Sequence, residues 1–194
     1  LGANVVVVNV GNAAMGGRDI DYTRDPFPLR LDSGAEQTMF NHRGFFPFGT
    51  SPVAEETMVT FGQVGSSTKV TEVGTAVVVK DFADGTTVVI HIKNALLVLD
   101  LREPLVDTIQ WYREAQTYVN LKTNTVDFEK HGFSIPFDTD RGFTVRMPNA
   151  SDLAHLQNAG GPASTAPFLT RGKSLGPAGL SSTQTIALWQ ARTC

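Results

Sequence analysis

The sequence predicts a mostly β domain, a compact β-barrel-like fold with one short helix. Two observations support this prediction. Short runs of β-branched residues recur over residues 27–148, and Gly-containing turns separate them. One stretch, 105–115, carries apolar residues at helical spacing. A chain of 194 residues, of which 41% are hydrophobic, is long enough for one such domain with an appendage.

The sequence predicts strands and hairpins in the N-terminal half. Val5–Val8 is a run of valines and predicts a strand, and a Gly/Asp/Arg/Pro-rich loop follows, so that residues 1–26 form an N-terminal strand and loop. Leu29–Asp32 is the next strand. The strand-like sequence from Val59 to Val79 predicts a long hairpin with a glycine-containing tip. Asp84-Gly85 between apolar runs predicts a second hairpin.

The second half starts with a buried strand at Leu96–Leu99. The predicted helix, about 105–115, rests on Leu105, Ile109, Tyr112 and Gln116, with Pro104 at its first position. Further strands are predicted at 117–121 and 124–128, and a hairpin at 132–136 and 142–147. The expected core residues in this half are Leu96, Leu97, Val98, Leu101, Leu105 and Ile109.

The composition changes after Asn149. Residues 158–183 are dominated by Gly, Pro, Ala, Ser and Thr, which bury little apolar surface. We therefore predict a linker over 149–187, followed by a short apolar segment at 188–194.

Composition also argues against several function classes. A net charge of −3 does not predict a nucleic-acid surface, and the apolar runs are too short for membrane-spanning helices. The single cysteine, Cys194, excludes an internal disulfide. The four histidines lack the spacing of metal ligands, so we expect no metal and no cofactor.

The most informative motif is Asp32-Ser33-Gly34-Ala35, which follows the apolar lead of a strand. An aspartic protease half-site needs a carboxylate at the end of a rigid strand, a neighbouring hydroxyl, and a glycine that lets two backbones approach. No second Asp-Ser/Thr-Gly occurs in the sequence. An active enzyme would therefore take its second aspartate from another copy of the chain.

Several ordered motifs together resemble the retropepsin-like protease of copia-type LTR retrotransposon polyproteins. The Asp-Ser-Gly-Ala motif is followed by Gly74-Thr75-Ala76-Val77, and then by Ile92–Val98. The resemblance covers about 27–148 and the last seven residues, where Leu188–Arg192 is similar to the motif that opens the pre-integrase segment. It implies a retropepsin-like protease domain over 27–148 with a closed β-barrel.

The resemblance also implies a mechanism. Asp32 of each subunit of a homodimer would share one proton across the dyad and activate a water molecule, which favours activity in acid. Ser33, Gly34 and Ala35 would support the carboxylate. The hairpin tip Phe61-Gly62-Gln63-Val64-Gly65 would be a flap over an extended peptide. The expected substrate is a Gag-Pol-type polyprotein, and the expected location is the cytoplasm, virus-like particles included.

Alternatives remain at the sequence level. Ser33 as a serine-protease nucleophile is disfavoured, because Leu31 stands where the GxSxG elbow needs glycine. Departures from the family pattern at Arg30, Leu99-Asp100, Pro104 and Gln190 motivate a catalytically silent dimerisation or peptide-binding module.

Two further groups of residues have competing interpretations. Phe45, Phe46 and Phe48 could line a substrate pocket, but we favour a local core. Asp138-Thr139-Asp140 is expected at the solvated surface.

Overall fold

The computed structural model describes residues 6–10, 20–61, 66–138, 142–158, 169–173 and 183–186. Its α-helices are α1 (Thr108–Ala115) and α2 (Ala150–Asn158), and its 3-10 turns are η1 (Arg43–Phe45) and η2 (Glu129–His131). The strands are β1 (Val6–Val10), β2 (Phe27–Pro28), β3 (Arg30–Asp32), β4 (Met39–Phe40), β5 (Thr50–Phe61), β6 (Ser66–Asp81), β7 (Thr86–Leu97), β8 (Leu105–Asp107), β9 (Thr117–Asn120), β10 (Thr125–Phe128), β11 (Phe133–Pro136), β12 (Thr144–Val145), β13 (Leu169–Lys173) and β14 (Thr183–Ile186).

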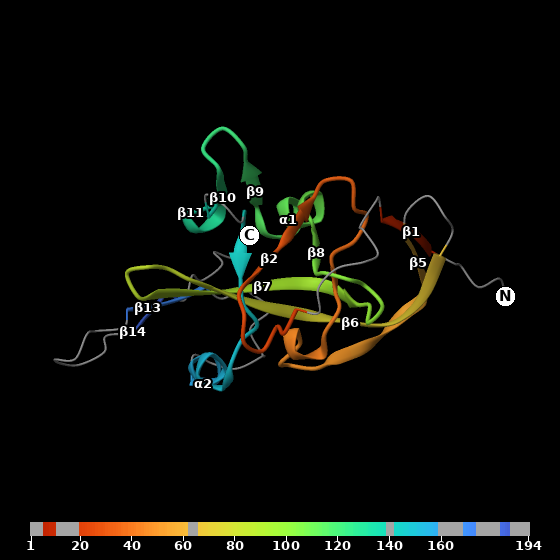
Figure 1. Cartoon of the computed structure of the whole chain (residues 1–194), viewed down its shortest axis with the longest axis horizontal. Coiled ribbons are helices and arrows are strands. Elements are labelled where there is room, and N and C mark those ends of the chain that lie inside the picture. Colours follow the sequence, from red (N-terminus) through yellow and green to blue (C-terminus); the bar gives the residue numbers. More distant parts are fainter. Residues whose placement is uncertain are drawn as a thin grey trace, which may run out of the picture.

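The prediction of a mostly β chain is confirmed. The main sheet runs in the order β1-β5-β6-β7-β4-β8-β3, and β13 and β14 join it beside β7. The long strands β5, β6 and β7 cross the molecule, with α1 on one side of them and α2 on the other (Figure 1). Two small sheets, β11-β10-β9 and β12-β2, complete the described pairings.

The sequence prediction differs from the structure in closure and in helix count. No closed barrel is detected over the described ranges, where the sheet path starts at β1 and ends at β3. Closure needs tilted strands with a matched stagger, whereas β3, β4 and β8 are only two or three residues long. Two α-helices are present in this part of the chain, where one was expected.

Both hairpins predicted in the N-terminal half are confirmed. β5 and β6 pair in antiparallel register up to Phe61↔Ser66, on either side of the predicted tip. β6 and β7 are joined through Gly85, whose φ is +76° and whose amide donates to the carbonyl of Phe82 at 3.0 Å. This positive φ suits glycine, so the Asp-Gly pair terminates the turn as expected.

The predicted helix and the strand before it need correction. β7 continues without a break to Leu97, and Leu99 lies in an exposed turn rather than in a strand. Leu105–Asp107 is strand β8, so α1 begins only at Thr108 and Pro104 precedes a strand. The three residues are extended because they pair with β3, and Leu105 also pairs with Met39 of β4.

The next strands are close to the prediction, but their partners differ. β9 and β10 form the expected antiparallel pair. The predicted hairpin of 132–136 with 142–147 does not form, because β11 pairs with β10 and β12 pairs with β2. An isolated antiparallel bridge, Asp138↔Gly142, connects that region instead.

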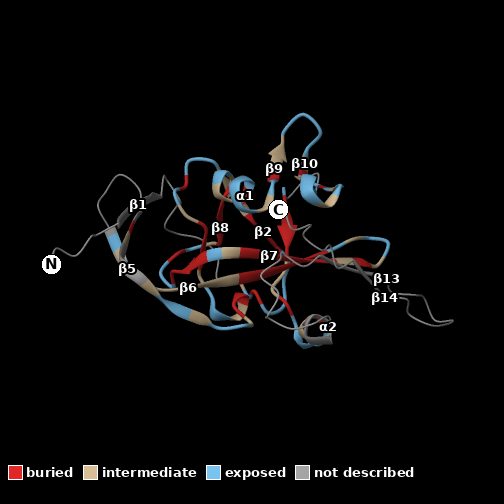
Figure 2. Cartoon of the chain, turned by 180° about the vertical axis from the view of Figure 1, so that it is seen from behind, coloured by how far each residue is buried: buried red, intermediate tan, exposed pale blue. Residues whose placement is uncertain are grey.

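The core lies on both faces of β6 and β7. Four consecutive residues, Ala76–Val79, are fully buried, and buried residues gather where these strands cross the middle of the molecule (Figure 2). Val78 belongs to the main core, whereas Val77 and Val79 pack with Val89, and Leu153 of α2 covers that second face. A strand buried on both faces explains an unbroken apolar run.

Most of the predicted core residues are confirmed. Phe45 and Phe46 are buried, but in the main core rather than in a separate local one, and Phe48 is exposed. Ile109 is wrong as a core residue, since 45% of it is exposed, and Trp111 is the buried residue of α1.

The described parts of the predicted linker form α2, β13 and β14. Asn149 caps α2: its Oδ1 accepts from the Asp152 amide at 3.0 Å, and Asp152 Oδ2 accepts from the Asn149 amide at 2.7 Å. This reciprocal pair is a capping box. β13 pairs with residues 86–89 of β7. The pre-integrase-like segment 188–194 lies outside the described residues.

Candidate active site

Asp32 is the last residue of β3, at the end of the main sheet. β3 pairs in parallel with β8, and Asp32 stands in register with Asp107. Asp32 is partly exposed, whereas Asp107 is buried. Because β3 pairs only with β8 among the described strands, Asp32 lies at a sheet edge that another chain can approach.

The turn after Asp32 orients its carboxylate. Asp32 Oδ1 accepts from the Gly34 amide at 2.8 Å, which closes an Asx-type turn. A Cβ at Gly34 would lie 3.3 Å from the same Oδ1, which is closer than usual for such a contact. Ser33 and Gly34 are exposed, while Ala35 is buried. The motif thus leaves its first three residues accessible and anchors the fourth.

The anchor of Ala35 is a hydrophobic cluster shared with the long hairpin. Ala35 and Met39 pack in one cluster with Val59 of β5 and Val70 of β6. Leu105 of β8 belongs to the same cluster. The arms of the predicted flap therefore pack on the core directly behind the Asp32 turn, as a hairpin that covers this turn would require.

The flap residues themselves are only partly described. Phe61 ends β5 and pairs with Ser66 of β6. Gly62, Gln63, Val64 and Gly65 lie outside the described residues, so their predicted role stays a prediction.

The Asp107 carboxylate caps a helix. Its Oδ1 accepts from the Ile109 amide at 2.8 Å and caps the N-terminus of α1. Asp32, by contrast, has Gly34 as its only recorded partner in the described part of the chain. The two aspartates are neighbours in register, but only Asp32 presents an accessible carboxylate.

Arg30, a departure from the family pattern, has a local explanation. It lies two residues before Asp32, on the same face of β3, and its guanidinium contacts Glu103 Oε1 at 3.0 Å. Both side chains are about one third exposed, at 35% and 28%. The ion pair keeps this cation directed at Glu103.

Sequence reasoning missed two ion-pair clusters far from Asp32. Buried Lys80 contacts Asp138 Oδ2 at 2.6 Å, and Asp138 itself is exposed, as expected. Arg146 contacts Asp81 at 2.5 Å and Asp152 at 2.6 Å. Residues 139–140 lie outside the described residues.

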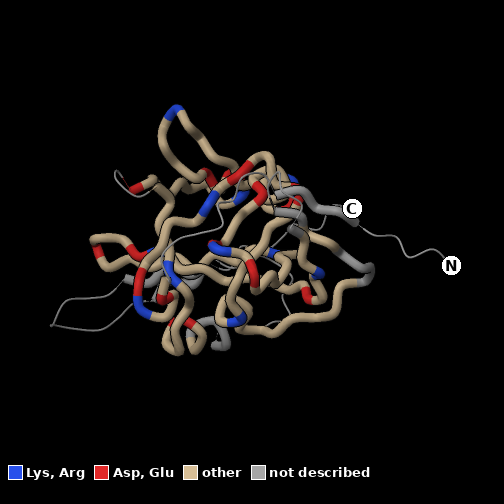
Figure 3. The backbone as a smooth tube through the Cα atoms, turned by 45° about the vertical axis from the view of Figure 1, so that its right-hand side comes forward, with Lys and Arg blue, Asp and Glu red and all other residues tan. Residues whose placement is uncertain are grey.

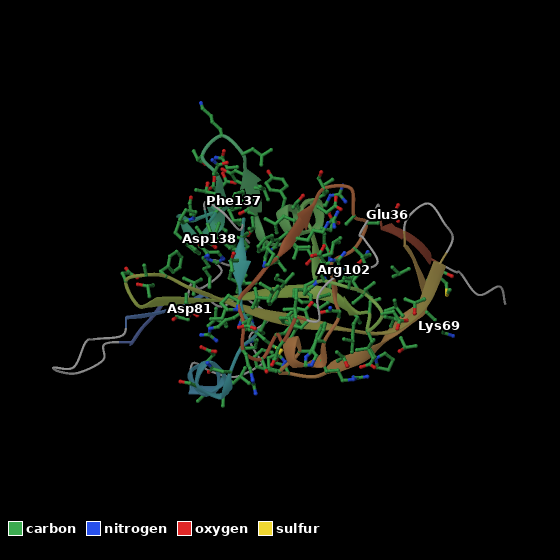
Figure 4. The ribbon with its side chains drawn as sticks, viewed as in Figure 1. Glu36, Lys69, Asp81, Arg102, Phe137 and Asp138 are labelled. Carbon is green, nitrogen blue, oxygen red and sulfur yellow. The ribbon has the colours of Figure 1, made fainter. Side chains whose placement is uncertain are left out.

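The tertiary fold brings the members of these ion-pair clusters together from distant parts of the sequence. Acidic and basic residues are interspersed along the chain (Figure 3). Asp81 and Asp138 lie together on one side, and Glu36, which follows the Asp32 turn, lies on the other (Figure 4). Only the capping-box spacing of Asn149 and Asp152 could have pointed to this region from the sequence. The clusters fasten α2 and β12 to the sheet and do not contribute to the site.

The pKa shifts follow from these contacts. Hydrogen bonds from Arg43 and Thr50 lower the pKa of Glu72 to about 2. The pKa of Asp138 is lowered, because hydrogen bonds from Lys80 and Thr144 outweigh its desolvation. Burial lowers the pKa of His91 to about 4, with a smaller contribution from the Lys93 charge. His91 lies on β7, and its ring centroid is 5.7 Å from that of Phe48.

Over the described ranges, no group of three or more His, Cys, Asp or Glu side chains could hold a metal ion. None of the helices in these ranges is long and apolar enough to cross a bilayer. Comparison with protein-family models, curated proteins and solved structures finds no match for this chain.

Proposed function

We propose that this chain is an aspartic endopeptidase of the retropepsin-like type that acts as a homodimer. The observation that carries the proposal is the accessible Asp32 carboxylate at the end of an edge strand, oriented by the Gly34 amide. The chain supplies one such carboxylate, so the dyad needs a second copy. Two carboxylates brought within about 3 Å share one proton, which gives one base and one acid at the same site.

The chemistry then needs no covalent intermediate. The ionised Asp32 of one subunit takes a proton from a bound water molecule, and the protonated Asp32 of the other donates to the scissile carbonyl. The long β5–β6 hairpin packs on the cluster behind the turn and supports a strand-like peptide above the dyad. The proposed substrate is the retrotransposon polyprotein implied by the sequence motifs, and the proposed setting is cytoplasmic.

A matched pair of variants tests the proposal. Asp32→Asn removes the titratable group and abolishes cleavage of polyprotein junction peptides in a mass-spectrometric assay. Asp107→Asn keeps activity, because asparagine caps a helix about as well as aspartate. Loss of activity in both variants would instead indicate a dyad within one chain, between register partners. Cleavage that persists in Asp32→Asn would end the proteolytic hypothesis.

Dimerisation has its own measurement. Activity per chain rises with chain concentration, and sedimentation velocity detects the dimer in the same range. Excess Asp32→Asn chain inhibits the wild type, because each mixed dimer carries one carboxylate. A folded wild-type dimer that cleaves nothing, even in acid, would favour the catalytically silent module. A monomer at high concentration would favour a peptide-binding module.

A further inference from the structure

The segment between Asp32 and β4 has two buried anchors, Ala35 in a hydrophobic cluster and Thr38. Only 1% of Thr38 is exposed, whereas Ser33, Gly34 and Glu36 before it are exposed. The Thr38 carbonyl accepts from the Leu96 amide at 2.9 Å, and this bond ties the segment to β7. The turn that carries Asp32 therefore lies between β3 and these two anchors, of which Thr38 is fixed by hydrogen bonds.

Thr38 makes two further bonds to the β8–α1 unit. Its hydroxyl accepts from the Asp107 amide at 3.2 Å. Its own amide donates to Gln110 Oε1 of α1 at 3.0 Å. The Asp107 amide belongs to the residue that stands beside Asp32 in the sheet. Both ends of the Asp32 turn are thus fastened to the same short strand and helix.

The orientation of the Gln110 amide is set by its other end. Gln110 Nε2 donates to Glu114 Oε1 at 3.1 Å, and the same oxygen accepts from Asn94 Nδ2 at 2.9 Å. A carboxylate only accepts, so the Gln110 amide nitrogen faces Glu114 and its oxygen faces the Thr38 amide. Thr38 is buried, and its N–H loses this acceptor if Gln110 is replaced.

We propose that Gln110 is a positioning residue for Asp32: it fixes the Thr38 amide and so holds the turn that carries the carboxylate. The catalytic consequence rests on the proposed function, whereas the effect on the turn does not. Gln110 has no recorded contact with Asp32 in the described part of the chain and acts through Thr38.

Three variants of the full chain test this. Gln110→Leu removes the acceptor at similar size. Gln110→Glu keeps an acceptor but places two carboxylates four residues apart on α1. The exchanged pair Gln110→Glu/Glu114→Gln restores every bond. The carboxylate at position 110 accepts from the Thr38 backbone amide and from the side-chain amide nitrogen at position 114. The side-chain amide oxygen at position 114 then accepts from Asn94 Nδ2. Arg113→Gln, at an exposed neighbouring position, is the control.

Amide exchange and NMR chemical shifts report on the turn directly. In Gln110→Leu we expect Thr38 amide exchange about tenfold faster, since loss of a buried donor's partner changes an equilibrium by about that factor. The NMR signal of the Gly34 amide shifts. In the cleavage assay, kcat falls about tenfold while KM stays within about twofold. The exchanged pair restores the Thr38 exchange rate, the Gly34 signal and kcat, and Gln110→Glu gives intermediate values.

The outcomes separate the two proposals. Unchanged Thr38 exchange in Gln110→Leu, or faster exchange with unchanged Gly34 and Asp32 signals, overturns the positioning role. Failure of the exchanged pair to restore exchange overturns it as well. A wild type that cleaves nothing overturns the proposed function, and amide exchange and the Gly34 signal then decide the role of Gln110 alone. If Gln110→Leu fails to fold, Gln110→Glu and the exchanged pair supply the comparison.

Discussion

Acid titration of His91 makes a quantitative prediction about stability. His91 lies 9% exposed on β7, and burial lowers its pKa from 6.5 to about 4. The unfolded chain therefore binds a proton more readily than the folded chain between these values. Stability contributed by the neutral imidazole is complete above pH 6.5 and is lost as pH falls toward 4. Proton linkage lowers the free energy of unfolding, relative to its value above pH 6.5, by about 2 kcal/mol at pH 5 and about 3 kcal/mol at pH 4.

The measurement compares wild type with His91→Gln, which keeps hydrogen-bonding groups but does not titrate. Urea unfolding at pH 7, 5.5, 5 and 4 gives the free energy of unfolding of each protein. Carboxylates titrate in both proteins, so the difference between them isolates His91. We expect this difference to move by about 3 kcal/mol in favour of the variant between pH 7 and pH 4. A difference that does not vary with pH would refute the assignment of His91 as a buried neutral imidazole.

Two further predictions concern single contacts. Asp138→Asn leaves the buried Lys80 ammonium without its carboxylate, and we expect it to lower the free energy of unfolding by about 3 kcal/mol. Lys80→Met lowers it by about 1 kcal/mol or less, because the Asp138 carboxylate left behind is half exposed. Equal losses of the two variants in urea unfolding would contradict this asymmetry. Gly34→Ala places a Cβ against Asp32 Oδ1, and we expect kcat to fall severalfold. The melting temperature is unchanged or slightly higher, because Gly34 is exposed and alanine restricts the unfolded chain. Full activity of this variant would show that the carboxylate has room to move.

Local signals predicted the parts of this fold that depend on local chemistry. Asp84-Gly85 marked a turn because few residues other than glycine adopt the positive φ found there. The valines of Ala76–Val79 marked a strand because β-branched side chains pack well on a pleated surface. Asp32 was found from the short Asp-Ser-Gly motif at the end of a strand, and the structure shows that the Gly34 amide closes the turn that orients it.

The errors occurred where distant segments compete for the same residues. Leu105 and Val106 suit a helix by spacing, but they are extended because β3 pairs along them. The helix then starts at Thr108, which turns Ile109 outward and brings Trp111 into the core, where its ring centroid lies 5.7 Å from that of Phe128. Periodicity alone could not reveal this shift, because the same side chains fit either starting point.

The sequence alone determined a β-rich chain, two of its hairpins, and one acidic turn at the end of a strand, because these depend on backbone preferences within a few residues. Tertiary structure decided what surrounds that turn. Gln110 lies 72 positions from Thr38, and Arg146 lies 65 from Asp81. No local preference encodes such pairs, since they need the segment before β4 to lie against α1, and the end of β6 to lie against the residue after β12.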